Sequence, residues 1–208
     1  MNSAAVPELQ IVILAAGFSS RLGRPKALAR VRSVSLLRRT LILTSRLAAV
    51  HTIAVLPRGA ARYRIEARGL KVTFAVNSRR SEGLSSSVRR GIAKARYSAA
   101  VLLLPVDLAA LQARDVALLI ARWRGARRRV IARRVEHGGN VHGGVPLILP
   151  RWLYEEALAV RGDTGLRGLV AALKPQQRVL LHLPSAAFDV DTPQDLRAAR
   201  RRPRASPR

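Results

Sequence analysis

The regular alternation of short apolar runs with helix-like stretches is the feature that most constrains the fold of this 208-residue chain. The run AVLLLPVD, which ends at Asp107, is apolar almost throughout, as expected for a strand that is covered on both faces. Strands that alternate with helices favour an α/β fold with a mainly parallel sheet. The predicted strands are Leu9–Leu14, Thr52–Leu56, Lys71–Val76, Ala100–Val106, Arg129–Arg133 and Arg178–Leu183.

Helical patterns lie between and after these strands. No internal repeat and no glycine- and serine-rich linker divides the chain, so we expect a single domain over residues 1–202 and a basic, disordered tail over 203–208. Ligands of open α/β sheets bind beyond the carboxyl ends of the strands, so the residues after each strand are the candidates for function. The predicted helices are Ser35–Ala49, Ala60–Arg68, Leu84–Ala95, Ala113–Arg124, Arg151–Ala159, Gly165–Leu173 and Pro193–Arg201.

Charge and composition narrow the class of protein. Lysine and arginine number 38 against 12 acidic residues, an excess that favours phosphorylated or polyanionic ligands. The arginines are scattered, however, and no nucleic-acid-binding motif appears, so nucleic acid is not expected as the main partner. The absence of cysteine excludes disulfides and thiolate zinc sites. With neither a membrane-spanning run nor a secretory signal, we expect a cytoplasmic protein without a membrane partner, as a monomer or weak oligomer.

The stretch LAAGFSSRLGRPKAL leads from the first predicted strand into a cationic loop. Small residues allow the backbone to approach a ligand closely, and glycine-rich turns with exposed N–H groups can bind anions. The loop matches neither G-x-x-x-x-G-K-[ST] nor G-x-G-x-x-G. Taken alone, it is either a phosphate-binding loop or a solvated basic turn. Its polar and charged members are Ser19, Ser20, Arg21, Arg24 and Lys26.

Acidic residues follow two apolar segments. Asp107 ends the run AVLLLPVD, where a carboxylate either holds Mg²⁺ or caps the next helix. In FDVDTPQDL, Asp189 and Asp191 are predicted to point to the same side of an extended segment. Thr192 suits an N-cap, with a proline after it and Asp195 three residues later. Carboxylates at strand ends of so basic a chain indicate a functional role for Asp107, Asp189 and Asp191.

Three further segments carry polar residues in suggestive patterns. NSRRSEGLSSSVRRGI, which begins at Asn77, either binds a phosphate at a helix start or has Ser81 or Ser85 as a helix cap. EHGGNVHGG, with His137 and His142, is interpreted as a flexible substrate-covering loop rather than a zinc site. RGDTGLRGLV begins a helix with a turn that binds an anion or caps the helix.

Taken in this order, the motifs resemble those of the MobA-like NTP transferase family, and within it those of the molybdenum cofactor cytidylyltransferases, from about Val12 to Leu196. The resemblance implies a three-layer, Rossmann-like fold of the nucleotide-diphospho-sugar transferase type, with Mg²⁺ as the cofactor. It implies Arg21, Lys26 and Asp107 as catalytic residues and Asp107 and Asp191 as metal ligands. Nucleotide contacts would come from Leu14, Ala15, Ala16, Gly17, Ser19, Arg21, Lys26, Asn77, Gly83 and Ser86, and acceptor contacts from His142, Gly144, Pro146, Gly162, Asp163 and Arg167.

The activity that the resemblance implies is transfer of CMP from CTP to the phosphate of molybdopterin or molybdenum cofactor, with release of pyrophosphate. It leaves a molybdoenzyme open as a partner. The stretch LAAG resembles the cytidylyl-transferring members, whereas LAGG is common in the guanylyl-transferring ones. The methyl group of Ala16 is expected to favour a pyrimidine. Ala109 and Leu166 stand where the family usually has proline and alanine.

Three alternatives stay open. The chain could transfer a nucleotidyl group to another phosphorylated small molecule, such as a sugar or alcohol phosphate. It could use GTP as a guanylyltransferase. It could also be a basic protein without enzymatic activity that binds nucleic acid or a protein partner.

Overall fold

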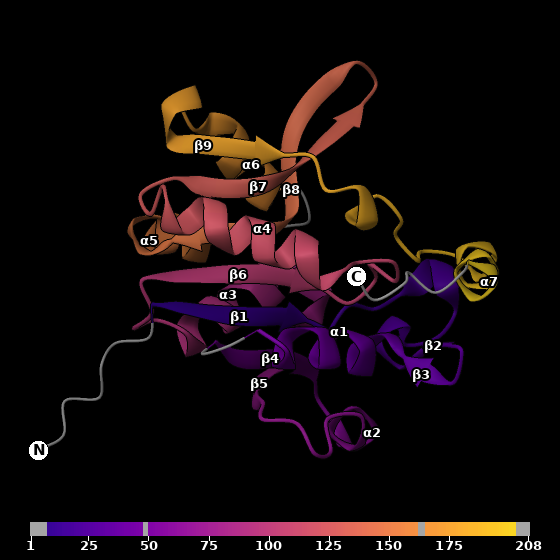
Figure 1. Ribbon diagram of the computed structural model, residues 1–208. Helices are drawn as coiled ribbons and strands as arrows, with labels where there is room; N and C mark the ends of the chain where they lie inside the picture. The colour runs from indigo at the N-terminus through magenta and orange to yellow at the C-terminus, as the bar shows by residue number, and fades with distance from the viewer. Residues whose placement is uncertain (1–7, 48–49, 162–164, 203–208) are drawn as a thin grey trace, which may run out of the picture.

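A seven-stranded sheet with the order β5-β4-β1-β6-β8-β7-β9 forms the centre of the computed structural model, which describes residues 8–47, 50–161 and 165–202 (Figure 1). Strand β8 is antiparallel to β6 and β7, whereas the other neighbouring strands are parallel. The predicted, mainly parallel sheet is therefore confirmed. The strands are β1 (Leu9–Leu14), β4 (His51–Pro57), β5 (Thr73–Asn77), β6 (Ala100–Pro105), β7 (Val130–His137), β8 (Asn140–Pro150) and β9 (Arg178–Leu181).

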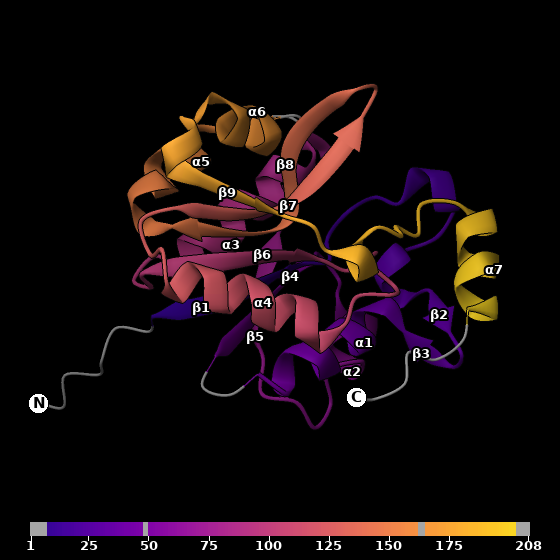
Figure 2. The same ribbon diagram turned by 45° about the horizontal axis from the view of Figure 1, so that its top comes forward.

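Helices cover both faces of this sheet, which gives the predicted three layers (Figures 1 and 2). Helices α1, α2 and α4 contribute to the core cluster on one face, and α3, α5 and α6 to that on the other. The α-helices are α1 (Leu36–Ser45), α2 (Ala61–Ile65), α3 (Leu84–Lys94), α4 (Ala113–Arg124), α5 (Tyr154–Ala159), α6 (Gly165–Ala172) and α7 (Pro193–Arg201). Short 3₁₀ helices are η1 (Ser20–Leu22), η2 (Lys26–Leu28), η3 (Arg80–Glu82), η4 (Arg151–Leu153), η5 (Pro175–Gln177) and η6 (Pro184–Ala186).

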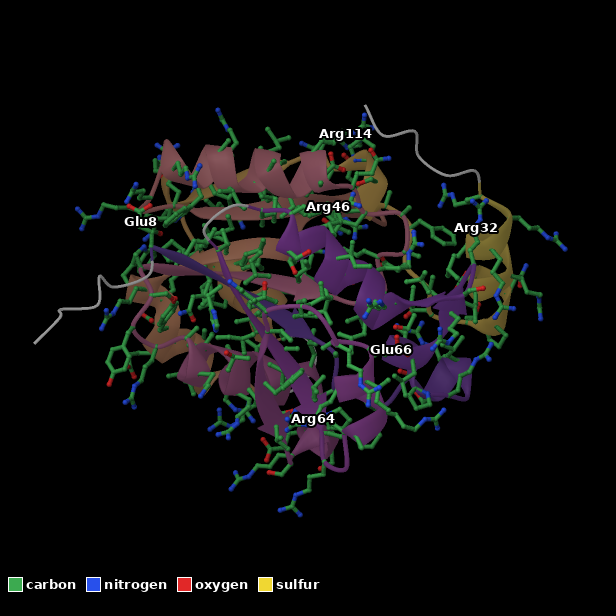
Figure 3. All side chains as sticks on the ribbon, turned by 60° about the horizontal axis from the view of Figure 1, so that its bottom comes forward. Glu8, Arg32, Arg46, Arg64, Glu66 and Arg114 are labelled. Carbon is green, nitrogen blue, oxygen red and sulfur yellow. The ribbon has the colours of Figure 1, made fainter. Side chains whose placement is uncertain are left out.

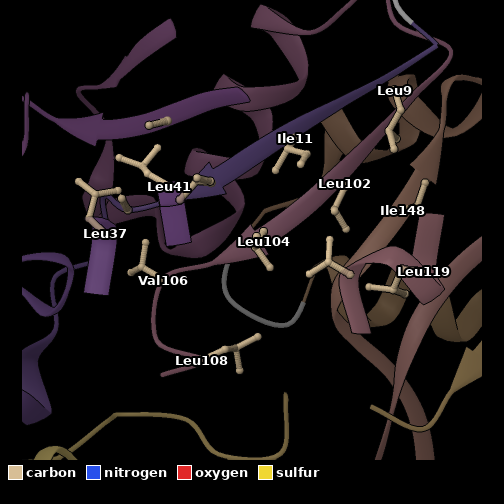
Figure 4. Packing of buried hydrophobic residues seen from close by; sticks show 14 of the residues in the cluster. Leu9, Ile11, Leu37, Leu41, Leu102, Leu104, Val106, Leu108, Leu119 and Ile148 are labelled. Atoms are coloured by element: carbon tan, nitrogen blue, oxygen red, sulfur yellow. The ribbon is translucent and has the colours of Figure 1, made fainter. Parts of the chain in front are cut away.

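The continuous apolar character of the central strands follows from this arrangement. Alternate residues of a strand face opposite sides of the sheet, and both sides are covered here. Ile11 of β1 and Leu102 of β6 pack with Leu41 of α1 and Leu119 of α4 on one side (Figure 4). Val12 and its alternating neighbours pack against α3 on the other side. Each central strand therefore needs apolar side chains at nearly every position.

A small hairpin and the last helix lie beyond the carboxyl end of β1. The strands β2 (Arg30–Val31) and β3 (Val34–Ser35) pair with each other, and α7 lies beside them (Figure 2). Val31 of the hairpin and Leu196 of α7 share a buried cluster with Val190. This packing holds the segment before α7 near the loop that follows β1.

The prediction of a loop around His137 and His142 is wrong, because the segment forms the hairpin of β7 and β8. Gly138 and Gly139 adopt positive φ angles of 57° and 77° in its turn, which suits a tight hairpin. At Gly143, an added Cβ would lie 2.6 Å from Cγ1 of Val170, so this glycine serves close packing. The glycines that suggested mobility therefore belong to a paired strand and its turn.

Three predicted helices are shorter than expected by three residues or more, among them α5, which begins at Tyr154 rather than Arg151. Helix α1 ends at Ser45 rather than Ala49, which lies outside the described residues, and α2 covers only Ala61–Ile65. The predicted tail 203–208 also lies outside the described residues. Within the described part, no helix is long and apolar enough to cross a membrane.

Arginine side chains project from many parts of the surface. Arg32, Arg64 and Arg114 lie in widely separated places around the molecule (Figure 3). Among the acidic residues, Glu66 is buried and accepts hydrogen bonds from Arg30 and from the hydroxyl of Ser35. The positive charge is thus spread over the surface, as the scattered sequence positions indicated, and does not itself mark a site.

Candidate functional site

One ammonium group lies between two carboxylates at the carboxyl ends of the central strands. Nζ of Lys26 donates a hydrogen bond of 2.9 Å to Oδ2 of Asp107 and one of 2.5 Å to Oδ1 of Asp191. Nη2 of Arg21 donates to the other oxygen of Asp191 at 2.8 Å. We call Arg21, Lys26, Asp107 and Asp191 the charge cluster. The structure thus brings together the four residues that the motifs predicted as catalytic or metal-binding.

The loop after β1 holds Lys26 in place through its own backbone. Ser19 adopts a left-handed conformation with φ of 60°, which is uncommon for a residue other than glycine. Its Oγ accepts a hydrogen bond of 2.9 Å from the backbone N–H of Lys26. Lys26 begins η2, and its side chain is only 15% exposed. The backbone of the loop therefore fixes the position of Lys26, although most residues between Gly17 and Pro25 are exposed.

The backbone of Asp107 attaches the segment before α7 to the end of β6. The carbonyl oxygen of Asp107 accepts hydrogen bonds from the N–H groups of Ala109 at 2.8 Å and Val190 at 3.0 Å. Ala109 can donate the first of these bonds, whereas a proline at this position could not. The second bond places Asp191, one residue later, beside Asp107.

A capping box at the start of α7 orients Asp191. Oδ2 of Asp195 accepts hydrogen bonds from the N–H groups of Asp191 and Thr192, at 3.0 Å and 2.8 Å. Oγ1 of Thr192 in turn accepts from the N–H of Asp195 at 3.2 Å. The predicted N-cap at Thr192 is confirmed, and it fixes the backbone that carries a member of the charge cluster.

The electrostatics of the cluster favour a charged lysine. Burial by itself lowers the pKa of the Lys26 ammonium, but the charges and hydrogen bonds of Asp107 and Asp191 outweigh burial and raise it.

The third predicted carboxylate, Asp189, precedes buried Val190 in the chain, and its segment forms no strand. Burial first, and then the charge of Asp107, raises the pKa of the Asp189 carboxyl, against the effect of Arg133.

The chemistry of the cluster fits a divalent cation. Two carboxylates converge on one positively charged group, and Mg²⁺ is typically held by one or two carboxylates together with substrate phosphates. No set of three or more His, Cys, Asp or Glu residues that could hold a metal occurs in the described part of the chain. Asp107 and Asp191 therefore suit a cation that arrives with phosphate ligands better than a closed protein-only site.

Asn77 and Ser86, two of the residues predicted to bind the nucleotide, are hydrogen-bonded to each other. Nδ2 of buried Asn77 donates to Oγ of Ser86 at 2.8 Å and of Ser87 at 3.0 Å, and its Oδ1 accepts from the N–H of Arg79 at 2.9 Å. Gly83, with φ of 80°, is the N-cap of α3, so the alternative of a cap by Ser81 or Ser85 is wrong. Asn77 and Ser86 thus shape the turn that leads into α3.

Other predicted nucleotide-binding residues offer mainly backbone. The side chains of Leu14, Ala15 and Ala16 are buried, and the methyl group of Ala16 belongs to the core cluster that contains Val88 of α3. Gly17 is exposed. A ligand that approaches this segment meets peptide groups rather than side chains.

The predicted acceptor residues are spread over two elements. His142, Gly144 and Pro146 lie on β8, and Arg167 is exposed on α6, whereas Gly162 and Asp163 lie outside the described residues. Gly144 pairs across the sheet with Arg133 of β7.

Arg133 lies close to the candidate site, and the sequence motifs did not single it out. Its side chain is 14% exposed, and Nη1 lies 3.4 Å from Oδ1 of Asp189. It connects β7 to the segment that leads to Asp191 of the charge cluster. An arginine inside the apolar run VIARRV was the available signal, but arginines elsewhere in the chain made it inconspicuous.

Comparisons with known proteins place this geometry in a family. The family model described as "MobA-like NTP transferase domain" matches residues 11–179. No curated protein gives a significant match to the sequence. Among solved structures, Rv0371c from Mycobacterium tuberculosis H37Rv is 26% identical with a TM-score of 0.73, and the match covers 92% of this chain and 96% of that one.

Two further structures share the fold. A complex of Rv0371c with manganese is 24% identical, with a TM-score of 0.67, over 92% of this chain and 97% of that one. The 2-C-methyl-D-erythritol 4-phosphate cytidylyltransferase from Thermus thermophilus is 22% identical, with a TM-score of 0.65, over 93% of this chain and 97% of that one.

Proposed function

We propose that this chain, which belongs to the MobA-like NTP transferase family, transfers CMP from CTP to the terminal phosphate of molybdopterin or molybdenum cofactor and releases pyrophosphate. The observation that carries the proposal is the ammonium of Lys26 bound between the carboxylates of Asp107 and Asp191. The choice of CTP and of the acceptor rests on the resemblance of LAAGFSSRLGRPKAL and the acceptor-side motif. We propose further that residues 1–202 act as one nucleotidyltransferase domain.

The reaction exchanges one phosphoanhydride bond for another. An oxygen of the acceptor phosphate forms a bond to the α-phosphorus of CTP, and the bond from that phosphorus to the oxygen bridging to the β-phosphorus breaks. The electron pair of the broken bond leaves with pyrophosphate. The acceptor phosphate is already ionised near neutral pH, so the protein does not need a strong general base. Its main tasks are positioning and charge neutralisation.

Arg21 and Lys26 would perform the neutralisation. Both are held by carboxylates, which keeps two cations beside the loop where the triphosphate is proposed to bind. On binding, Lys26 would exchange carboxylate oxygens for phosphate oxygens, whose negative charge favours the charged ammonium as the carboxylates do before binding. Cations that are already in position can stabilise the negative charge that develops on the leaving pyrophosphate, and the protein does not have to rearrange during the reaction.

Asp107 and Asp191 would hold the Mg²⁺ or Mn²⁺ ion that accompanies the nucleotide. Such an ion polarises the α-phosphate and neutralises phosphate oxygens. Ser19 and the capping-box residue Asp195 would support the site by fixing the backbones that carry Lys26 and Asp191. Arg133 lies beside Asp189 at the edge toward β8, where the acceptor would enter.

A pyrophosphate-release assay tests the proposal. The purified chain is incubated with Mg²⁺ and one of the four NTPs. Each NTP is tested with molybdenum cofactor as the acceptor, with 2-C-methyl-D-erythritol 4-phosphate as the acceptor, and without an acceptor. We expect release only with CTP and molybdenum cofactor. Release with CTP and the erythritol phosphate would assign the chain to the alternative acceptor class, and release from GTP alone would overturn the base assignment.

A further inference from the structure

A guanidinium from one loop of the site covers an aromatic ring from another. Cζ of Arg80 lies 4.2 Å from the ring centroid of Phe18, which belongs to the loop after β1. Nη2 of the same arginine donates a hydrogen bond of 3.0 Å to the carbonyl oxygen of Gly17. Arg80 begins η3, in the loop after β5. One side chain thus connects the two loops on which the predicted nucleotide contacts lie.

Core packing does not account for this pair. Phe18 is 59% exposed and belongs to none of the buried core clusters of the described residues. Nε of Arg80 is buried without a hydrogen-bond partner in the described part of the chain, which makes the arrangement unfavourable for stability alone. Arginine suits the position because a planar guanidinium can stack on a ring while it donates in its own plane.

We propose that Arg80 is a positioning residue that sets the affinity for the nucleotide by holding Gly17 and Phe18 in a binding-ready conformation. The inference rests on the proposed function, because it concerns the same NTP site. Glycine gives the loop backbone freedom that binding must remove, and fixing it beforehand lowers that cost. Lys26 is held by Asp107 and Asp191 and not by Arg80, so Lys26 keeps its contacts when Arg80 is replaced.

The expected signature is a split between affinity and turnover. Loss of an interaction that helps ground state and transition state equally raises KM and leaves kcat unchanged. For Arg80→Ala we expect the Kd for Mg·CTP in calorimetry, and KM in pyrophosphate release, to rise about tenfold with kcat nearly constant. Arg80→Lys keeps the charge but not the planar fork, so we expect only a small recovery.

Phe18→Leu provides a second, independent variant. It keeps an apolar side chain in the loop and removes the ring beneath the guanidinium, so a moderate rise in Kd is expected. Because the two residues act through one contact, the double variant should bind no more weakly than Arg80→Ala alone. Losses that simply add would contradict a shared role.

Arg96→Ala is a matched control. The guanidinium of Arg96 covers Tyr97 at 4.5 Å, and Tyr97 is also 59% exposed, but the pair lies just after α3, away from its N-terminal end. We expect wild-type affinity from this variant. If the wild type binds no NTP, the proposed function itself fails. If the wild type binds CTP and Arg80→Ala binds it equally well, or loses kcat together with melting temperature, only the positioning role is overturned.

Discussion

Nζ of Lys26 lies 2.9 Å from Oδ2 of Asp107, although the two residues are 81 positions apart in the chain. The contact forms because β1 and β6 are parallel neighbours, with Leu14 in register with Pro105. Loops that follow two such strands emerge at the same edge of the sheet. A cationic loop and a carboxylate that are unremarkable separately therefore become one site.

Lys26→Ala is expected to remove most of the catalysis. A cation that stabilises developing charge in such a site is worth about 10²–10³ in rate. We expect kcat/KM for pyrophosphate release to fall by that order, and a much smaller loss for Arg21→Ala, whose side chain is 71% exposed. Exposed Lys94 on α3 provides the control, and Lys94→Ala should retain wild-type kinetics. Equal rates in the two lysine variants would show that Lys26 does not act on the reaction.

Stability at alkaline pH should report the ion pairs of Lys26. Burial lowers its pKa, but Asp107 and Asp191 raise it more, so the folded value lies above the unfolded one. The resulting stabilisation is fully present below the unfolded pKa of about 10.4 and is lost as pH rises through the folded value. Urea unfolding from pH 8 upward should show the wild type more stable than Lys26→Met, with the difference shrinking above about pH 10. A constant difference would contradict this assignment.

Asp107→Asn is expected to weaken the dependence on divalent cations. The amide keeps the shape of the side chain and one oxygen that can accept from Lys26, but it loses the negative charge that attracts the ion. The Mg²⁺ concentration for half-maximal pyrophosphate release should rise. Glu8→Gln is the control, because Glu8 pairs with Arg127 at the surface. Unchanged Mg²⁺ dependence in Asp107→Asn would exclude Asp107 as a metal ligand.

Asp195→Asn tests the capping box that carries Asp191. Hydrogen bonds from the side chain and backbone of Thr192, and then from the backbone of Asp191, lower the pKa of the Asp195 carboxyl. Its stabilisation is therefore present above the unfolded pKa of about 3.9 and is lost as pH falls through the folded value. The melting temperature of the variant should be lower than that of the wild type at pH 7, and the two should converge in acid. A difference that persists in acid would point to another cause.

Two glycine-to-alanine changes should have opposite effects. A Cβ at Gly91 of α3 would overlap Cγ1 of Val12, so Gly91→Ala is expected to destabilise the fold by about 1–3 kcal/mol. At Gly168 of α6, the added group would meet no atom within 4 Å beyond its chain neighbours and the backbone of its own helix. Gly168→Ala should stabilise by up to about 1 kcal/mol through helix propensity. Chemical denaturation measures both, and a stabilised Gly91→Ala would contradict the packing of α3 on β1.

The sequence predicted the parts of the fold in which pattern and environment agree. β1 and β6 are buried on both faces, so their apolar runs were unambiguous. β8 was missed because Gly143 and Gly144 interrupt the apolar alternation. A side chain at either glycine would clash with Val170 or Val135, and a sequence pattern does not show that these valines lie beside the glycines.

The same limit applies to the site. Lys26, Asp107 and Asp191 could be predicted because each follows a recognisable apolar run or belongs to a family motif. Arg80 and Arg133 could not, since arginine is abundant in every segment and only the tertiary structure shows which guanidinium faces Phe18 or Asp189.

The most direct test of the central claim is identification of the reaction product. The wild type and the Lys26→Ala/Asp107→Ala double variant are incubated with CTP, Mg²⁺ and molybdenum cofactor, and the products are analysed by mass spectrometry alongside pyrophosphate. Circular dichroism establishes that the variant is folded. We predict a cytidylylated cofactor and an equal amount of pyrophosphate from the wild type, and neither from the variant. Equal product from a folded variant, or no nucleotidylated product from the wild type with any NTP and phosphorylated acceptor, would contradict the account.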